Sequence, residues 1–168
     1  MNILITGASG FIGFNLLNKL SANKKYKILA LSRKKNFNKI SKNIKTLKSD
    51  LVMSSSSFNL IKVFSPQILI HLAWQDIPDY SIKKSQINFL KQKLFFQKIN
   101  KLDSVKKIIV TGSCSEHKNK HHLTSKFFVN SKNKIKKIIK KQKKNLIWLR
   151  LFFVFGQRQR KKALIPSI

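Results

Sequence analysis

The start of the sequence carries a glycine spacing that suits the binding of an anion. The segment NILITGASGFIG is a short apolar run that leads into Gly7, Gly10 and Gly13, after which an apolar helical pattern begins. Glycines at this spacing permit positive φ angles and a close backbone approach, so that free N–H groups near Phe11 can face a pyrophosphate. The spacing GxxGxxG differs from the GxGxxG dinucleotide fingerprint, and a plain strand-to-helix turn is the alternative.

A second group of reactive side chains lies close together later in the sequence. Cys114, Glu116, His117, His121 and His122 include the single cysteine and three of the four histidines. Ligands of these types are able to hold zinc. Structural zinc sites, however, usually take paired ligands from two elements, whereas one short loop supplies all of these. We therefore expect no metal site.

The rest of the chain alternates between strand and helix patterns that would position these groups. Apolar runs predict strands over residues 2–6, 27–32, 44–48, 67–73, 106–111 and 146–152. Helical patterns lie between them, at residues 11–22, 56–64, 80–101 and 125–143. Several runs, such as ILIHLAW, are apolar on both faces, as in buried parallel strands. We predict an α/β fold with a doubly wound parallel sheet of the Rossmann type, which binds ligands at the carboxyl ends of its strands.

Length and composition indicate one domain in a reducing compartment. The chain has 168 residues, and the 42% that are hydrophobic suffice for one core. The single cysteine permits no internal disulfide. No apolar run approaches the roughly 18 residues of a membrane span, and no signal-peptide pattern stands at the N-terminus. We expect a cytoplasmic protein without a membrane span.

The charge of the chain is strongly positive. There are 36 Lys and Arg residues against 5 Asp and Glu, which gives a formal net charge of +31. Such a field attracts polyanions through counterion release, whether or not function requires it. The basic residues are mostly dispersed lysines, without interleaved aromatic side chains that could stack bases. We attribute them to the compositional drift of an AT-rich genome and expect no specific nucleic-acid ligand.

Five segments of the sequence, taken in order, resemble one enzyme family. They are TGASGFIG at 6–13, HLAW at 71–74, VTGSCSE at 110–116, HLTSK at 122–126 and LRLFFVFGQRQR at 149–160. Together they resemble the extended short-chain dehydrogenase/reductase family, the NAD(P)-dependent epimerases, dehydratases and ketoreductases of nucleotide sugars. The resemblance implies a dinucleotide-binding domain over residues 1–156. It also implies that residues 157–168 begin a C-terminal substrate lobe that this sequence does not contain.

The resemblance assigns cofactor contacts along the chain. Ser32 and Arg33 stand where an NAD-specific relative presents an acid, so Arg33 could hold a 2′-phosphate, and NADP is favoured over NAD. The alternative for Arg33 is a solvated surface arginine. The alternative for Asp50 is an aspartate that forms a turn or an N-cap. The expected cofactor-binding residues are Gly7, Gly10, Phe11, Ile12, Gly13, Ser32, Arg33, Asp50, Leu51, Leu72, Ala73, Trp74, Asn88, Lys126 and Phe152.

The catalytic residues of the resembling family are a Ser or Thr, a Tyr and a Lys. The hydroxyl residue binds the sugar, the tyrosine transfers a proton, and the lysine binds the nicotinamide ribose. Ser113 and Lys126 match the first and last of these residues, whereas His122 occupies the tyrosine position. A neutral imidazole is also able to transfer a proton. The resemblance therefore implies Ser113, His122 and Lys126 as catalytic residues.

Three hypotheses for function stay open. The first is an NAD(P)-dependent epimerase, dehydratase or ketoreductase that acts on a nucleotide-activated sugar in polysaccharide biosynthesis. The second is a catalytically inactive dinucleotide-binding module, or half of a split enzyme with a separately encoded substrate lobe. Two departures from the family support this alternative: the tyrosine is replaced, and the segment between Ser113 and His122 is shorter than in the family. The third is a basic nucleic-acid-associating protein.

Helices 80–101 and 125–143 occupy the positions through which the resembling enzymes form homodimers. Apolar residues of the first helix would support such a contact, although repulsion between lysine-coated helices opposes it. These residues are Leu90, Leu94, Phe95 and Ile99.

Three further features are interpreted as structural. The basic segment 130–144 suits a sheet-covering helix with a solvated lysine face, and a membrane-surface or partner-binding helix is the alternative. His71 is expected to pack at a strand end rather than bind a ligand. The serine run 54–57 is expected to cap a helix.

Overall fold

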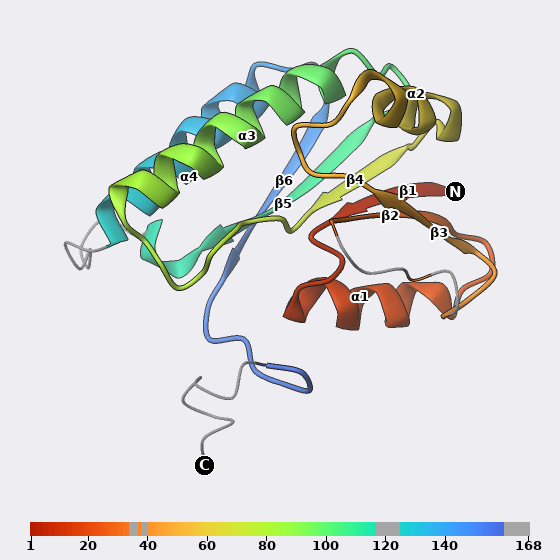
Figure 1. The fold of residues 1–168 in the computed structure, drawn as a ribbon, viewed down its shortest axis with the longest axis horizontal. Coiled ribbons are helices and arrows are strands. Elements are labelled where there is room, and N and C mark those ends of the chain that lie inside the picture. The colour runs from red at the N-terminus through yellow and green to blue at the C-terminus, as the bar shows by residue number, and fades with distance from the viewer. Residues whose placement is uncertain (34–36, 38–39, 117–124, 160–168) are drawn as a thin grey trace.

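A parallel sheet organises the computed structural model, which describes residues 1–33, 37, 40–116 and 125–159 (Figure 1). Within these residues the sheet has six strands in the order β3-β2-β1-β4-β5-β6, and every neighbouring pair is parallel. The first three strands coincide with their predicted ranges, and the others differ from them by one or two residues at each end. The strands are β1 Asn2–Thr6, β2 Lys27–Ser32, β3 Ile44–Lys48, β4 Ile68–His71, β5 Lys107–Ser113 and β6 Asn145–Leu151.

Helices cover the two faces of the sheet unequally. One face carries α1, and the other carries α2 with α3 and α4 side by side (Figure 1). None of the described helices is both long and apolar enough to cross a bilayer. Their bounds are α1 Phe11–Ser21, α2 Ser55–Phe64, α3 Ile82–Asn100 and α4 Lys126–Lys140, with a short 3-10 helix, η1, at Cys114–Glu116. The doubly wound parallel α/β fold predicted from the sequence is confirmed.

Alternating side chains of the central strands form two cores, one on each face. In β1, Ile3 and Ile5 pack on the α1 side, whereas Leu4 packs on the side of α2, α3 and α4. All three side chains are buried because both faces of the sheet are covered. This arrangement explains why the strand patterns are continuously apolar rather than alternating.

Serine side chains begin two of the helices. The Ser54 hydroxyl accepts a hydrogen bond from the Ser57 N–H at 3.2 Å at the start of α2, which confirms the predicted cap. The Ser81 hydroxyl accepts in the same way from the Lys84 N–H at the start of α3. These bonds satisfy donors that the first helical turn leaves without a partner.

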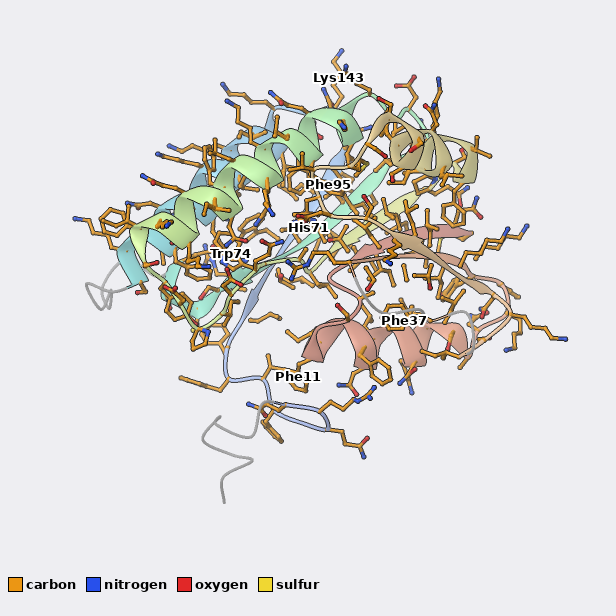
Figure 2. The ribbon with its side chains drawn as sticks, in the orientation of Figure 1. Phe11, Phe37, His71, Trp74, Phe95 and Lys143 are labelled. Atoms are coloured by element: carbon orange, nitrogen blue, oxygen red, sulfur yellow. The ribbon has the colours of Figure 1, made fainter. Side chains whose placement is uncertain are left out.

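His71 ends β4 beneath α3, as Figure 2 shows, with its ring 1% exposed. The Gln92 Oε1 atom lies 3.2 Å from Nε2 of the ring, and the Thr6 hydroxyl lies 2.8 Å from Nδ1. Because an amide oxygen only accepts, Nε2 carries the proton and Nδ1 accepts from Thr6. The ring also packs against Phe95 and Phe96. The interpretation of His71 as a packing residue is confirmed.

The proposed dimer residues on α3 divide into two groups. Phe95 and Ile99 are fully buried in the core, so their assignment to a dimer contact was wrong. They face the sheet because they lie on the apolar stripe that α3 packs against the strands. Leu90 and Leu94 are 56% and 45% exposed.

The helix within the basic segment covers the sheet as predicted, with one exception. α4 buries Ile135 and Ile139 in the core and exposes lysines such as Lys134 and Lys140. Lys132, in contrast, lies on the buried side of the helix and is 7% exposed. The expectation that the lysines of this segment are solvated is therefore wrong for Lys132.

The environment of His71 predicts a loss of stability in mild acid. Burial lowers the pKa of His71 to about 3, so that the unfolded chain takes up a proton near its ordinary pKa of 6.5 while the folded chain does not. Stability is therefore complete above about pH 6.5 and falls as the pH decreases towards 3, by about 2 kcal/mol at pH 5. NMR titration should show a His71 ring that is still neutral at pH 5. A midpoint near pH 6.5 for this ring would contradict the burial argument.

Candidate functional site

The turn between β1 and α1 passes directly against the end of β4. Gly7 has a φ of +71°, and a Cβ atom there would lie 2.7 Å from the Ala73 nitrogen. A Cβ atom on Gly13 would lie 2.1 Å from the carbonyl oxygen of Gly7. No side chain fits at either position, since atoms this close would have to move. The two glycines therefore allow the turn and the adjoining strand end to approach each other.

The N-terminus of α1 is open to an anion. Its N-cap residue, Gly10, has extended backbone angles and makes no side-chain capping bond, and the first turn carries no acidic residue. This helix end differs from the serine-capped ends of α2 and α3. The N–H groups and the positive end of the helix dipole at Phe11, Ile12 and Gly13 therefore suit a phosphate group.

A pocket of about 210 Å³ extends from this helix end along the carboxyl ends of β1, β2, β3 and β4. The glycine turn lines one part of it, and the segments that follow the strands line the rest. The expected cofactor residues in its lining are Gly7, Gly10, Ser32, Arg33, Asp50, Leu51, Leu72, Ala73 and Trp74. The fold therefore brings together residues that lie far apart in the sequence.

Four further lining residues were not expected: Ser9, Leu31, Ser49 and Gln75. Each is the sequence neighbour of an expected residue, so including those neighbours would have found them. Gln75 is placed by Asn88, which was expected to bind the cofactor. The Asn88 Oδ1 atom accepts from the Gln75 N–H at 2.8 Å, and its amide donates to the Gln75 carbonyl oxygen at 3.2 Å. Asn88 is buried in α3 and does not line the pocket itself.

Asp50 takes part in a small polar network at the pocket. Its Oδ2 atom is 2.7 Å from Nζ of Lys91, and its Oδ1 atom accepts from the Leu51 N–H at 2.7 Å. Burial alone would raise the pKa of Asp50, but the hydrogen bonds from Lys91 and Leu51 and the charge of Arg33 outweigh it and lower this pKa. Asp50 is therefore ionised at neutral pH. Its negative charge attracts the positive charges of Lys91 and Arg33.

The remaining expected cofactor residues lie outside the pocket lining. Lys126 is the exposed first residue of α4. Phe152 follows β6 and is 66% exposed.

The structure describes two of the three expected catalytic residues, Ser113 and Lys126. Ser113 ends β5, and its hydroxyl accepts a hydrogen bond from the Ser115 N–H at 3.2 Å. Lys126 begins α4 at the same, carboxyl edge of the sheet (Figure 1). His122 lies outside the described residues.

Glu116 lies beside Ser113, although from the sequence it was considered only as a metal ligand. Its Oε1 atom accepts from the Ser113 N–H and its Oε2 atom from Nε1 of Trp148, each at 2.8 Å. A Cβ atom on Gly112 would lie 2.3 Å from Nε1 of Trp148 and 2.6 Å from the first of these oxygens, so a larger residue there would displace both side chains. The carboxylate thus fixes the backbone of Ser113. In the described part of the chain no group of three His, Cys, Asp or Glu residues could hold a metal ion, and His117 and His121 lie outside it.

Comparison with known proteins gives the family of the chain. The profile of the NAD dependent epimerase/dehydratase family matches residues 3–168, and the chain belongs to this family. Comparison with curated proteins gives no match.

Solved structures of nucleotide-sugar enzymes share the fold. UDP-glucose 4-epimerase from Thermotoga maritima with UDP-glucose has a TM-score of 0.76 and 18% identity over 97% of this chain and 59% of that chain. UDP-glucuronic acid 4-epimerase from Bacillus cereus in complex with NAD has a TM-score of 0.79 and 18% identity, and the match covers 97% of this chain and 60% of that chain. An NAD-dependent NDP-hexosamine 5,6-dehydratase involved in tunicamycin biosynthesis has a TM-score of 0.75 and 19% identity, and the match covers 99% of this chain and 59% of that chain. The chain thus spans about 60% of the length of these proteins.

The geometry of the glycine turn predicts different effects for two alanine substitutions. Gly13→Ala forces a methyl group against the Gly7 carbonyl oxygen and should lower stability by about 2 kcal/mol or more. Gly10→Ala is the matched control, because its Cβ atom would meet only the Gly7 oxygen at 3.3 Å. Thermal unfolding of both variants measures the difference. Equal melting temperatures would show that the turn relaxes freely.

Proposed function

We propose that this chain binds NADP in the pocket described above and belongs to an enzyme that epimerises, dehydrates or reduces a nucleotide-activated sugar. The observation that carries the proposal is the pocket itself. It joins the open N-terminus of α1, the glycine turn at Gly7 and the ends of β2 and β4 in one site. Membership of the NAD dependent epimerase/dehydratase family supports a nicotinamide dinucleotide as its ligand.

The residues present fit each part of the dinucleotide. The pyrophosphate would lie at Gly10 and the first turn of α1, where no Cβ atom or acidic side chain interferes. Arg33, exposed at the pocket, would hold the 2′-phosphate that distinguishes NADP from NAD. Leu51 would pack against the adenine, and the segment from Leu72 to Trp74 would follow the cofactor towards β5. When bound, the nicotinamide supplies hydride exchange with a sugar carbon.

Residues at the carboxyl edge of the sheet would bind the sugar and transfer the proton. The Ser113 hydroxyl would donate a hydrogen bond to an oxygen of the sugar, from a backbone position that Glu116 fixes. The His122 imidazole would take up or release the proton of the reacting hydroxyl, in place of the family tyrosine. Lys126 would hold the nicotinamide ribose.

A second candidate is a dinucleotide-binding module without turnover of its own, or half of a split enzyme. Lys126 is exposed at the start of α4 and does not line the pocket, which favours this candidate. In that case a separately encoded lobe would supply the sugar contacts.

Cofactor preference tests the assignment of Arg33. We expect the chain to bind NADPH more tightly than NADH, and Arg33→Asp to weaken NADPH binding by about tenfold or more, because a charge-assisted pair is lost and a repulsion is gained. Lys45→Asp is the matched control, since it changes the net charge equally at an exposed position of β3. Calorimetric titration with both nucleotides measures the affinities. Equal binding of NADPH and NADH by the unaltered chain would remove the argument for NADP.

Turnover distinguishes the two candidates. Loss of a positioned proton-transfer group typically removes about 10² to 10⁴ in rate. Under the second candidate, in which His122 does not replace the tyrosine, the isolated chain should therefore bind NADPH yet show little or no conversion of UDP-glucose or UDP-glucuronic acid. Chromatographic product analysis measures the conversion. Robust conversion that His122→Ala abolishes would instead show that the chain is an active enzyme in which histidine replaces tyrosine.

A further inference from the structure

A buried cation lies beside the dinucleotide pocket and has no role in the site described so far. Lys132 of α4 is 7% exposed, although lysines are rarely buried without a charged partner. The ion pairs between described residues do not include it. Its Nζ atom instead donates a hydrogen bond to the carbonyl oxygen of Thr111 in β5, at 2.6 Å.

Two aromatic rings complete the surroundings of the ammonium group. Its Nζ atom lies 4.9 Å from the ring centroid of Trp74 and 5.5 Å from that of Phe128. The two rings meet edge to face, with their centroids 4.9 Å apart. Cations are attracted to aromatic faces, and most strongly where water is excluded. Since Trp74 lines the dinucleotide pocket, Lys132 holds part of the pocket wall.

Lys132 also fixes the end of β5. The carbonyl oxygen that it binds belongs to Thr111, on one side of Gly112, and Glu116 binds the N–H group of Ser113 on the other side. Figure 2 shows Trp74 beside the end of the sheet, below α3 and α4. The ends of β4 and β5 are thus both tied to α4 through one ammonium group.

We propose that Lys132 is a positioning residue for dinucleotide binding, whose charged ammonium holds Trp74 and the end of β5 in the arrangement that shapes the pocket. This inference rests on the proposed function, because it takes the ligand of the pocket to be a nicotinamide dinucleotide. Loss of the charge removes the attraction to both rings, although the neutral amine is still able to donate to Thr111. The pocket then binds the dinucleotide more weakly while α4 stays on the sheet.

The electrostatics of the position make this role sensitive to pH. Burial lowers the pKa of Lys132 to about 8, and the Glu116 carboxylate acts in the opposite direction. The charged or titratable groups that face it are Glu116 from η1 and His71 from β4. The His71 imidazole is neutral between pH 7 and 9.5, because burial lowers its pKa to about 3. Over that range the charge that changes at this position is therefore that of Lys132.

Calorimetric titration with NADPH at fixed ionic strength between pH 7 and 9.5 tests the inference. The unaltered chain should lose about three- to tenfold in affinity in one step centred near pH 8. Lys132→Met should bind at pH 7 as weakly as the unaltered chain does at pH 9.5, and without a step. Lys132→Arg keeps its charge throughout and should bind tightly without a step. A purely structural side chain would not produce this pH profile.

A matched control comes from the same helix. Lys134 is exposed, with its Nζ atom 5.6 Å from the ring centroid of Phe89, and Lys134→Met should keep the step of the unaltered chain.

Tight binding with a flat profile in the unaltered chain overturns the inference but not the proposed function. An equal step in Lys132→Met overturns it as well. If Lys132→Met does not fold, the profiles of the unaltered chain and of Lys132→Arg decide. Failure to bind NADPH and NADH at every pH overturns the proposed function, and this inference with it.

Discussion

The contact between the β1–α1 turn and the end of β4 is the constraint on which the rest of the site depends. Gly7 and Gly13 bring backbone against backbone at distances that no side chain could share. This contact aims the N-terminus of α1 along the carboxyl edge of the sheet. It also places the segment from Leu72 to Trp74 beside the turn, so that both line one pocket. A helix end that suits a phosphate group and an apolar wall therefore arise from a single packing requirement.

The excess of lysine imposes a second constraint, because the chain has too few carboxylates to pair with buried cations. Backbone carbonyl oxygens take their place. Lys144 donates to the carbonyl oxygens of Leu102 and Val105, and Lys98 donates to that of Met53. Lys132 does the same at Thr111, where it also contacts aromatic rings. These lysines link segments that are distant in the sequence, so a basic composition contributes to the fold without implying a nucleic-acid ligand.

The few carboxylates that the chain retains are concentrated at the carboxyl edge of the sheet. Asp50 pairs with Lys91 beside the pocket, and Glu116 fixes the backbone of Ser113. Asp50 and Lys91 are distant in the sequence, and Glu116 also joins distant segments through the hydrogen bond that it accepts from Nε1 of Trp148. In a chain with five acidic residues, these positions indicate where geometry must be held most firmly.

The sequence by itself determined the fold and most of the pocket. Continuous apolar runs identify buried parallel strands, and the glycine spacing identifies the turn at Gly7, because these signals are local and their periods are fixed by backbone geometry. Tertiary structure alone decided which side chains meet. The apolar stripe of α3 turned Phe95 towards the core, and Lys132 and Glu116 found partners on β5 and β6. A helical pattern shows which face is buried but not which carbonyl, ring or carboxylate lies opposite it, since those partners come from strands elsewhere in the chain.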